Sequence, residues 1–156
     1  GDGFMDTPMG AQPMPDSQRA EMARGMRRQP IVMAQHRNDT DFKTQYLGSE
    51  EIDGAKVEVL LVTMAGDETR LFIEPAGRVV RQAYRGQSQA GPGEFVASYS
   101  DFRQISGVTF AFKSQVTMNG EPVQSSIYEE IALNPQVDAA IFAKPDKAAP
   151  TAKDGQ

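Results

Sequence analysis

The sequence has no cysteine, no tryptophan and a single histidine among its 156 residues. Without cysteine there can be no disulfide, no thiol nucleophile and no thiolate metal ligand. One histidine does not provide the paired spacing of His/Cys metal sites, and neither the HExxH motif nor its inverted form occurs. His36 stands between Gln35 and Arg37 at the predicted end of a helix, where we expect it to cap the helix or to be exposed. We therefore expect no metal ion and no cofactor.

Other patterns of catalytic residues are also missing. The sequence has no GxSxG nucleophile elbow and no glycine-rich loop of the kind that holds phosphates. Glu129 and Glu130 are adjacent on a predicted strand, so their side chains point to opposite faces and do not form the paired carboxylates of a glycosidase. We therefore expect this chain to have no enzymatic activity of its own.

Long hydrophobic runs and an excess of positive charge are lacking too. No apolar run approaches the length of a membrane span, so no transmembrane segment is predicted. The net charge of −5 and the pI of about 4.9 argue against a nucleic-acid partner, which usually requires a basic face. The sequence starts at Gly1 without an initiator methionine and shows no signal peptide, so we expect it to derive from a cleaved or trimmed precursor.

At the two ends of the chain, the sequence predicts little regular structure apart from short helices. Residues 1–15 combine Gly, Pro and Met without a helical period and are expected to form an irregular leading segment, or an extended one with a short strand around Phe4-Met5. Residues 16–36 predict two short helices. In the first of them Arg24, Arg27 and Arg28 lie toward the C-terminal end, where they complement the helix dipole or, less often, bind an anion.

The C-terminal region follows the last predicted strand. Residues 138–143 are predicted to form one helical turn, in which Ile141 and Phe142 plug the end of the sheet. Residues 146–156 contain no large apolar residue and are expected to be disordered.

Between residues 42 and 133 the sequence predicts strands. From Val108 to Met118 apolar and polar residues alternate, which indicates a half-buried strand. Lys56–Met64 is apolar on both sides, so this strand is expected to be covered on both faces. About seven strands follow the two helices. The predicted fold class is therefore mainly β (α+β): a curled antiparallel meander, or half barrel, with one or two short helices packed on one face.

Asn119-Gly120 is the strongest hairpin signal, because both central residues of a type I′ turn need positive φ. If these two residues form the loop, the apolar residues of the preceding strand face apolar partners. The predicted pairs are Val116 with Val123, Phe112 with Ile127, and Val108 with Ile131. Glu129 then lies on the same face, either reaching water or a helix cation near the strand end, or serving as a polar anchor in an apolar cavity.

Several short strings of turn and core residues resemble a known family. They are Tyr46-Leu-Gly-x-Glu-Glu-x-Asp-Gly54, Leu71-Phe-Ile-x-Pro-x-Gly77, Val79-Val-Arg81, Tyr99-Ser-Asp-Phe-Arg103, Gly107-Val-x-Phe-x-Phe112 and Asn134-Pro-x-Val-Asp-x-x-Ile-Phe-x-x-Pro145. Over residues 46–145 the sequence is similar to the C-terminal two-thirds of the outer-membrane lipoprotein carrier and sorting family (LolA/LolB type). It is most similar to the version fused behind pitrilysin/insulinase-type zinc peptidases.

The resemblance implies a fold and a location. In that family a half barrel wraps round helices, and its concave apolar face holds acyl chains or another apolar ligand in the cell envelope. We therefore expect a single half-barrel domain over residues 16–145, located in the periplasm or cell envelope of a bacterium. The family's first strands are missing from this sequence, as is the zinc peptidase motif. A peptidase activity would belong to other parts of a parent chain.

Three functions remain open at this stage. The first is a non-catalytic domain that binds a lipid, an acyl chain or another apolar ligand on the concave face of the sheet. The second is an accessory or substrate-docking domain of a zinc peptidase, with a lipoprotein or a peptidase domain as partner. The third is a structural module that self-associates, for example as a homodimer. The candidate ligand-binding residues are those of the predicted hairpin: Val108, Phe110, Phe112, Val116, Val123, Ile127, Ile131 and Glu129.

Overall fold

The computed structural model describes residues 3–7, 10–88 and 91–142. These residues form two compact units. One unit comprises the described residues up to Ala23 together with those from Asn134 onward, and the other comprises Arg24–Leu133. The boundary at Ala23 lies inside helix α1 (Asp16–Arg27). The single domain over residues 16–145 stays a prediction.

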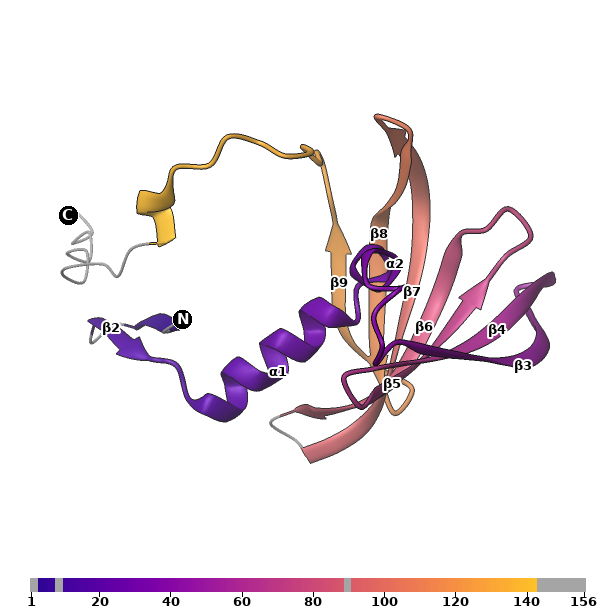
Figure 1. Cartoon of the computed structure of the whole chain (residues 1–156), viewed down its shortest axis with the longest axis horizontal. Helices are drawn as coiled ribbons and strands as arrows, with labels where there is room; N and C mark the ends of the chain where they lie inside the picture. The colour runs from indigo at the N-terminus through magenta and orange to yellow at the C-terminus, as the bar shows by residue number, and fades with distance from the viewer. Residues whose placement is uncertain (1–2, 8–9, 89–90, 143–156) are drawn as a thin grey trace, which may run out of the picture. The chain divides into compact units, whose positions relative to one another are not determined.

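The larger unit is built on a seven-stranded antiparallel sheet in which each strand pairs with the next along the chain (Figure 1). Helix α2 (Pro30–Gln35) precedes this sheet, which is not closed into a barrel. The mainly β meander with two short helices is therefore confirmed. Its strands are β3 (Lys43–Ile52), β4 (Ala55–Met64), β5 (Asp67–Ile73), β6 (Val79–Ser88), β7 (Gly91–Ile105), β8 (Val108–Met118) and β9 (Glu121–Ile127).

Four of the connections between strands are two-residue turns in which both residues have positive φ. This backbone matches the right-handed twist of the flanking strands, which makes the hairpins tight. The four turns are Asp53-Gly54, Ala65-Gly66, Ser106-Gly107 and Asn119-Gly120. The hairpin predicted at Asn119-Gly120 is thus confirmed, with Met118 opposite Glu121.

We expect replacing Gly120 by alanine to lower the free energy of unfolding by about 1–2 kcal/mol, because a side chain is strained at its φ of 90°. Gly25→Ala is the matched control. Gly25 lies inside α1, and a β-carbon there would meet no atom within 4 Å. This control should raise stability by about 1 kcal/mol. Urea unfolding followed by circular dichroism measures both changes, and an equal shift of the two variants would contradict the turn assignment.

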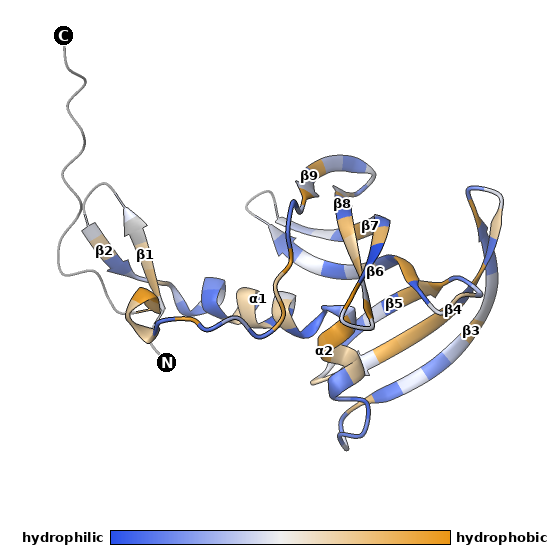
Figure 2. Cartoon of the chain, turned by 90° about the horizontal axis from the view of Figure 1, so that it is seen from above, coloured by the Kyte–Doolittle hydropathy of each residue, from blue (hydrophilic) through white to orange (hydrophobic). Residues whose placement is uncertain are grey.

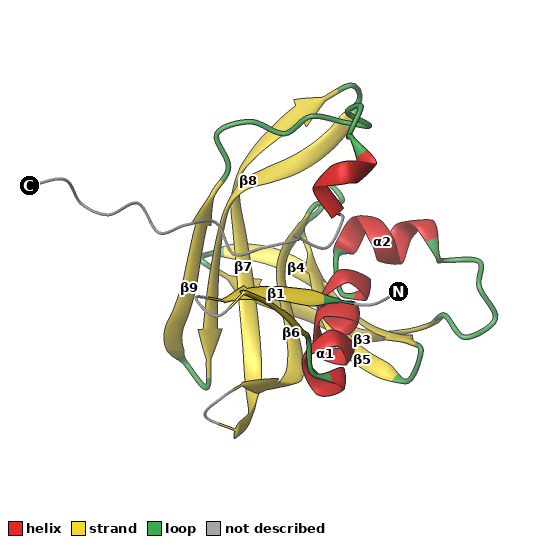
Figure 3. Cartoon of the chain, turned by 90° about the vertical axis from the view of Figure 1, so that its left-hand side faces the viewer, coloured by secondary structure: helices red, strands yellow, loops and turns green. Residues whose placement is uncertain are grey.

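The sheet buries apolar side chains on both of its faces, as the apolar residues on both sides of Lys56–Met64 indicated. Residues paired across strands share a face, so the register separates the two sets. Val57, Val59, Phe72 and Ala83 form one cluster, on what we call the inner face. Every residue packed in this cluster belongs to a strand, which means that the curl of the sheet itself buries it. Figure 3 shows this curvature, and Figure 2 shows the hydrophobic stretch of β4.

The opposite face, which we call the helix face, carries Val62 and Leu71. Met33 of α2 packs against these two residues and is itself buried. Pro30 stands at the start of α2, where its missing N–H removes no hydrogen bond. The predicted packing of a short helix on one face of the sheet is therefore present in α2.

The predicted register of the last hairpin is wrong beyond its first two pairs. Thr117 still faces Pro122, but the register then shifts, so that Val116 faces Gln124 and Lys113 faces Ile127. The extra residue, Val123, is more than half exposed. Proline lacks the N–H that a regular ladder needs, and bulges are where strands accommodate it.

The shift has two consequences for the predicted apolar face. Ile127 moves from the side of Phe112 to the side of Lys113, because one extra residue reverses the alternation. Strand β9 ends at Ile127, so Glu129 and Ile131 lie outside the sheet ladder. Val108 consequently has no partner in β9, and its side chain is exposed.

The smaller unit contains a hairpin of which the sequence indicated one strand, around Phe4-Met5. Strand β1 (Phe4–Thr7) lies at that position, and β2 (Gly10–Pro13), which was not predicted, pairs with it antiparallel. Gly10 has a φ of 100°, and the Thr7 hydroxyl donates to the carbonyl of Gly10 at 2.8 Å. These local bonds allow a short hairpin in a segment without an alternating pattern.

The helical turn predicted near the C-terminus is present as a 3-10 turn, Ala139–Phe142. Ile141 and Phe142 are 67% and 78% exposed, and their role as a plug at the end of the sheet stays a prediction. Residue 143 and the tail at 146–156 lie outside the described residues.

Candidate groove on the inner face of the sheet

A groove of about 490 Å³ crosses the sheet from the β3–β4 hairpin to β9. Six of the seven strands of the sheet contribute residues to its lining, so the groove depends on the curl rather than on one loop. The lining residues are Ile52, Asp53, Ala55, Val57, Glu74, Val80, Arg81, Ser98, Tyr99, Ser100, Lys113, Ser114, Gln115, Ser125, Ser126 and Ile127.

One part of the lining is apolar. Val57 is 1% exposed and belongs to the inner-face cluster, while Ile52 and Val80 pack against the same cluster. Ile127 contributes an apolar side chain from β9, where it is 70% exposed. The groove therefore offers an accessible isoleucine together with the edge of a packed core.

A polar row crosses the same groove. Arg81 pairs with Ser98, Ser98 with Gln115, and Gln115 with Ser125, which gives one residue from each of β6, β7, β8 and β9. Paired residues share a face, so these four side chains follow one line across the inner face. The lining thus combines an apolar part with a row of hydrogen-bonding groups, which suits an amphipathic ligand.

Four charged residues line the groove: Asp53, Glu74, Arg81 and Lys113. Glu74 accepts a hydrogen bond from the guanidinium of Arg78. The Nε atom of Arg81 is buried and has no hydrogen-bond partner. The two cationic side chains of the lining therefore come from neighbouring parts of the sheet, Arg81 from β6 and Lys113 from β8.

Two titratable groups in and beside the groove have shifted pKa values. Burial raises the pKa of Tyr99, and the neighbouring phenols of Tyr84 and Tyr128 raise it further, so its hydroxyl keeps its proton at neutral pH. At the β3–β4 edge, hydrogen bonds from Tyr46, Ser49 and Lys56 lower the pKa of Glu58 to about 2. The carboxylate of Glu58 is therefore ionised at neutral pH. It already accepts hydrogen bonds from three side chains, which indicates a structural role.

No group of three or more His, Cys, Asp or Glu side chains within residues 3–7, 10–88 and 91–142 is placed to hold a metal ion. The Nδ1 atom of His36 lies 2.7 Å from a carboxylate oxygen of Asp39, and its side chain is exposed as expected. In the part of the chain that the structure describes, no helix has the length and hydrophobicity to cross a membrane.

The structure brings one of the eight predicted hairpin residues, Ile127, to the groove. Phe110, Phe112 and Val116 point to the helix face instead, since they alternate with the groove-lining Lys113 and Gln115. Phe112 is 4% exposed, and the guanidinium of Arg103 lies 4.3 Å from its ring centroid. The role of these residues in ligand binding stays a prediction.

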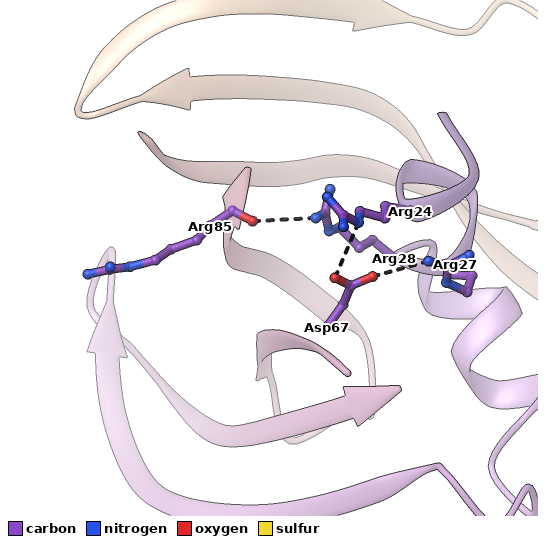
Figure 4. Close-up of polar contacts among 5 residues, drawn as sticks. All are labelled: Arg24, Arg27, Arg28, Asp67 and Arg85. Atoms are coloured by element: carbon purple, nitrogen blue, oxygen red, sulfur yellow. Dashed lines mark hydrogen bonds and ion pairs between the residues drawn. The ribbon is translucent and has the colours of Figure 1, made fainter. Parts of the chain in front are cut away.

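The arginines at the end of α1 are more engaged than their sequence pattern indicated (Figure 4). Arg27 lies 3.2 Å and Arg24 3.6 Å from the two carboxylate oxygens of Asp67, which begins β5. Arg28 is 5% exposed, and its guanidinium lies 4.3 Å from the ring centroid of Tyr84. The cluster anchors the end of the helix to the sheet, and Arg28 is a buried group rather than part of a solvated face.

No family model matches the sequence, and no curated protein matches it. Two solved structures are similar to it in fold. One, described as an outer membrane lipoprotein-sorting protein domain from Vibrio parahaemolyticus, is 13% identical, with a TM-score of 0.41 over 60% of this chain and 45% of its own. The other, a LolA superfamily protein from Nitrosomonas europaea, is 15% identical, with a TM-score of 0.48 over 92% of this chain and 66% of its own. The chain thus spans less than two thirds of the length of each structure.

Proposed function

We propose that this chain is a non-catalytic binding domain that holds one amphipathic ligand, a lipid or an acyl chain, in the groove on the inner face of the sheet. The groove itself carries the proposal. Its volume of about 490 Å³ falls in the range of small-molecule sites, roughly 300–1,000 Å³. Its lining has an apolar part around Ile52 and Val57 and a polar row that begins at Arg81.

The chemistry of the lining supports binding over catalysis. The serine hydroxyls of the polar row have no histidine beside them, because His36 is held by Asp39 at a helix end. A hydroxyl without a neighbouring base is a weak nucleophile but a good hydrogen-bond partner. The polar row therefore serves to orient a ligand head, while the apolar part takes a chain.

Two further parts of the proposal rest on the resemblance of the sequence motifs. They are the location in the bacterial cell envelope and a protein partner, either a lipoprotein or the peptidase domain of a parent chain. A homodimer has separate support, since β3 lies at the edge of the sheet with its outer side chains largely exposed.

Native mass spectrometry of the purified protein, before and after organic extraction, tests the ligand proposal. We expect a bound mass of a few hundred daltons, of the size of one lipid, that is lost on extraction. A mass equal to the bare chain, together with failure of the extracted protein to bind added dodecanoate, would overturn the proposal. A doubled mass at low concentration would favour the homodimer.

We expect Ser98→Phe to weaken dodecanoate binding by about tenfold or more, because the ring would occupy the middle of the polar row. Thr109→Phe on β8 is the matched control, since Thr109 is exposed and lies outside the groove. Isothermal titration calorimetry on both variants measures the difference. Equal affinities would show that the ligand occupies another surface.

A further inference from the structure

We propose that Arg81 and Lys113 form a subsite for an anionic headgroup, so that the groove selects acidic single-chain amphiphiles over neutral ones. This inference rests on the proposed function and names the class of ligand for that same groove. Both side chains line the groove, one from β6 and the other from β8.

Arg81 is held in the groove without a counter-charge. Its Nε atom is buried and lacks a hydrogen-bond partner, and no ion pair joins it to another described residue. Arg81 lines the groove, and its planar guanidinium matches a carboxylate or a phosphate in a two-point contact.

Lys113 stands on the other side of strand β7. It pairs with Ser100, while Arg81 pairs with Ser98, so the two cations are offset by two residues across two strand spacings. This offset places their Cα atoms about 12 Å apart, given strand spacings of about 4.8 Å and a rise of about 3.3 Å per residue. Two long side chains can converge on one anion over that separation, with the hydroxyls of Ser98 and Ser100 between them as further donors.

The acidic residues nearby are engaged elsewhere or distant along the sheet. Asp101 accepts hydrogen bonds from the Nε and Nη2 atoms of Arg103 at 3.1 and 2.8 Å, and these bonds lower its pKa, with a smaller contribution from the charge of Lys113. Glu74 accepts from Arg78. Asp53 belongs to the turn between β3 and β4, and β4 is four strands away from β8 in the order of the sheet. The β6–β8 part of the groove therefore keeps its positive charge for a ligand.

Binding of dodecanoate, dodecyl phosphate and dodecanol to the chain at pH 7.5, measured by displacement of a fluorescent probe, tests the subsite. We expect the two anionic probes to bind on the order of tenfold more tightly than the alcohol, as hydrogen bonds to charged groups allow. The tighter of the two anions identifies the head as a carboxylate or a phosphate. The preference should shrink as salt concentration rises, because Lys113 is exposed.

The double variant Arg81→Gln/Lys113→Gln should remove the preference, so that the two anions bind no more tightly than dodecanol binds to the same variant. Lys113→Glu tests the subsite even if the double variant folds poorly, because Lys113 is exposed. This variant should weaken binding of both anions. Arg85→Gln, which removes an exposed cation outside the groove lining, is the control and should keep the preference. Equal binding of dodecanoate and dodecanol to the unaltered chain would overturn the subsite and leave the proposed function intact. Binding of none of the three would overturn both.

Discussion

Replacing Phe72 by alanine is expected to lower the free energy of unfolding by about 3–5 kcal/mol, the usual cost of removing a buried phenyl ring. Phe72 is 6% exposed and packs with Val57, Val59 and Ala83 in the inner-face cluster. Its neighbours on adjacent strands are Val59 and Arg81, so the ring lies between the core and the groove. The sheet alone supplies this cluster, so no helix can shift to fill the cavity.

Urea unfolding followed by far-ultraviolet circular dichroism measures the change, since the chain has no tryptophan. Val123→Ala is the control and should change stability by less than about 0.5 kcal/mol, because Val123 is exposed at the bulge in β9. A loss below about 1 kcal/mol for Phe72→Ala would mean that the ring is not buried by the curl of the sheet.

The order of strands was predictable because local signals specify it. Each strand alternates with a short turn, and pairs such as Asp53-Gly54 and Asn119-Gly120 leave the chain few other conformations. Strands joined by two-residue turns must pair with each other, so a meander follows directly. Apolar residues on both sides of Lys56–Met64 likewise required cover on both faces, which the inner-face cluster and Met33 provide.

The register of the last hairpin was not predictable from alternation alone. The apolar residues Val116 and Val123 match well in a regular ladder, and the turn supports the same pairing. Pro122 breaks the ladder one residue after the first pair, and the bulge moves Ile127 to the other face. A search that weighs proline within strands would have found this signal.

The groove was hidden from the sequence for a different reason. Ser98, Gln115 and Ser125 are polar residues within strands, as solvent-facing residues are, so their type does not distinguish a face toward water from a groove. Only the curl of the sheet brings their face toward the β3–β4 hairpin. The apolar face of β8 was a natural candidate for a ligand, but part of it is filled by Phe112 and its stacked arginine.

Replacing Arg28 by alanine is expected to lower the free energy of unfolding by about 2–4 kcal/mol, from lost packing, a lost cation–π contact and a lost hydrogen bond. The guanidinium lies 4.3 Å from the centroid of Tyr84, and its Nη2 atom donates to the carbonyl of Arg85 at 3.4 Å. Arg28→Lys keeps the charge but loses the planar stack, so we expect it to recover at most about half of the loss.

Arg85→Ala is the control that distinguishes the loss of the Arg28 contacts from the loss of a positive charge. It also removes one positive charge, but it leaves the backbone carbonyl that accepts from Arg28 in place. Arg85 is exposed, so this control should change stability by less than about 0.5 kcal/mol. The same urea unfolding measurements at low and high salt compare the three variants. Because Arg28 is buried against Tyr84, the loss of stability in Arg28→Ala should persist in high salt. An equal loss in Arg28→Ala and Arg85→Ala that salt reduces would instead show that charge balance, rather than stacking, stabilises the end of α1.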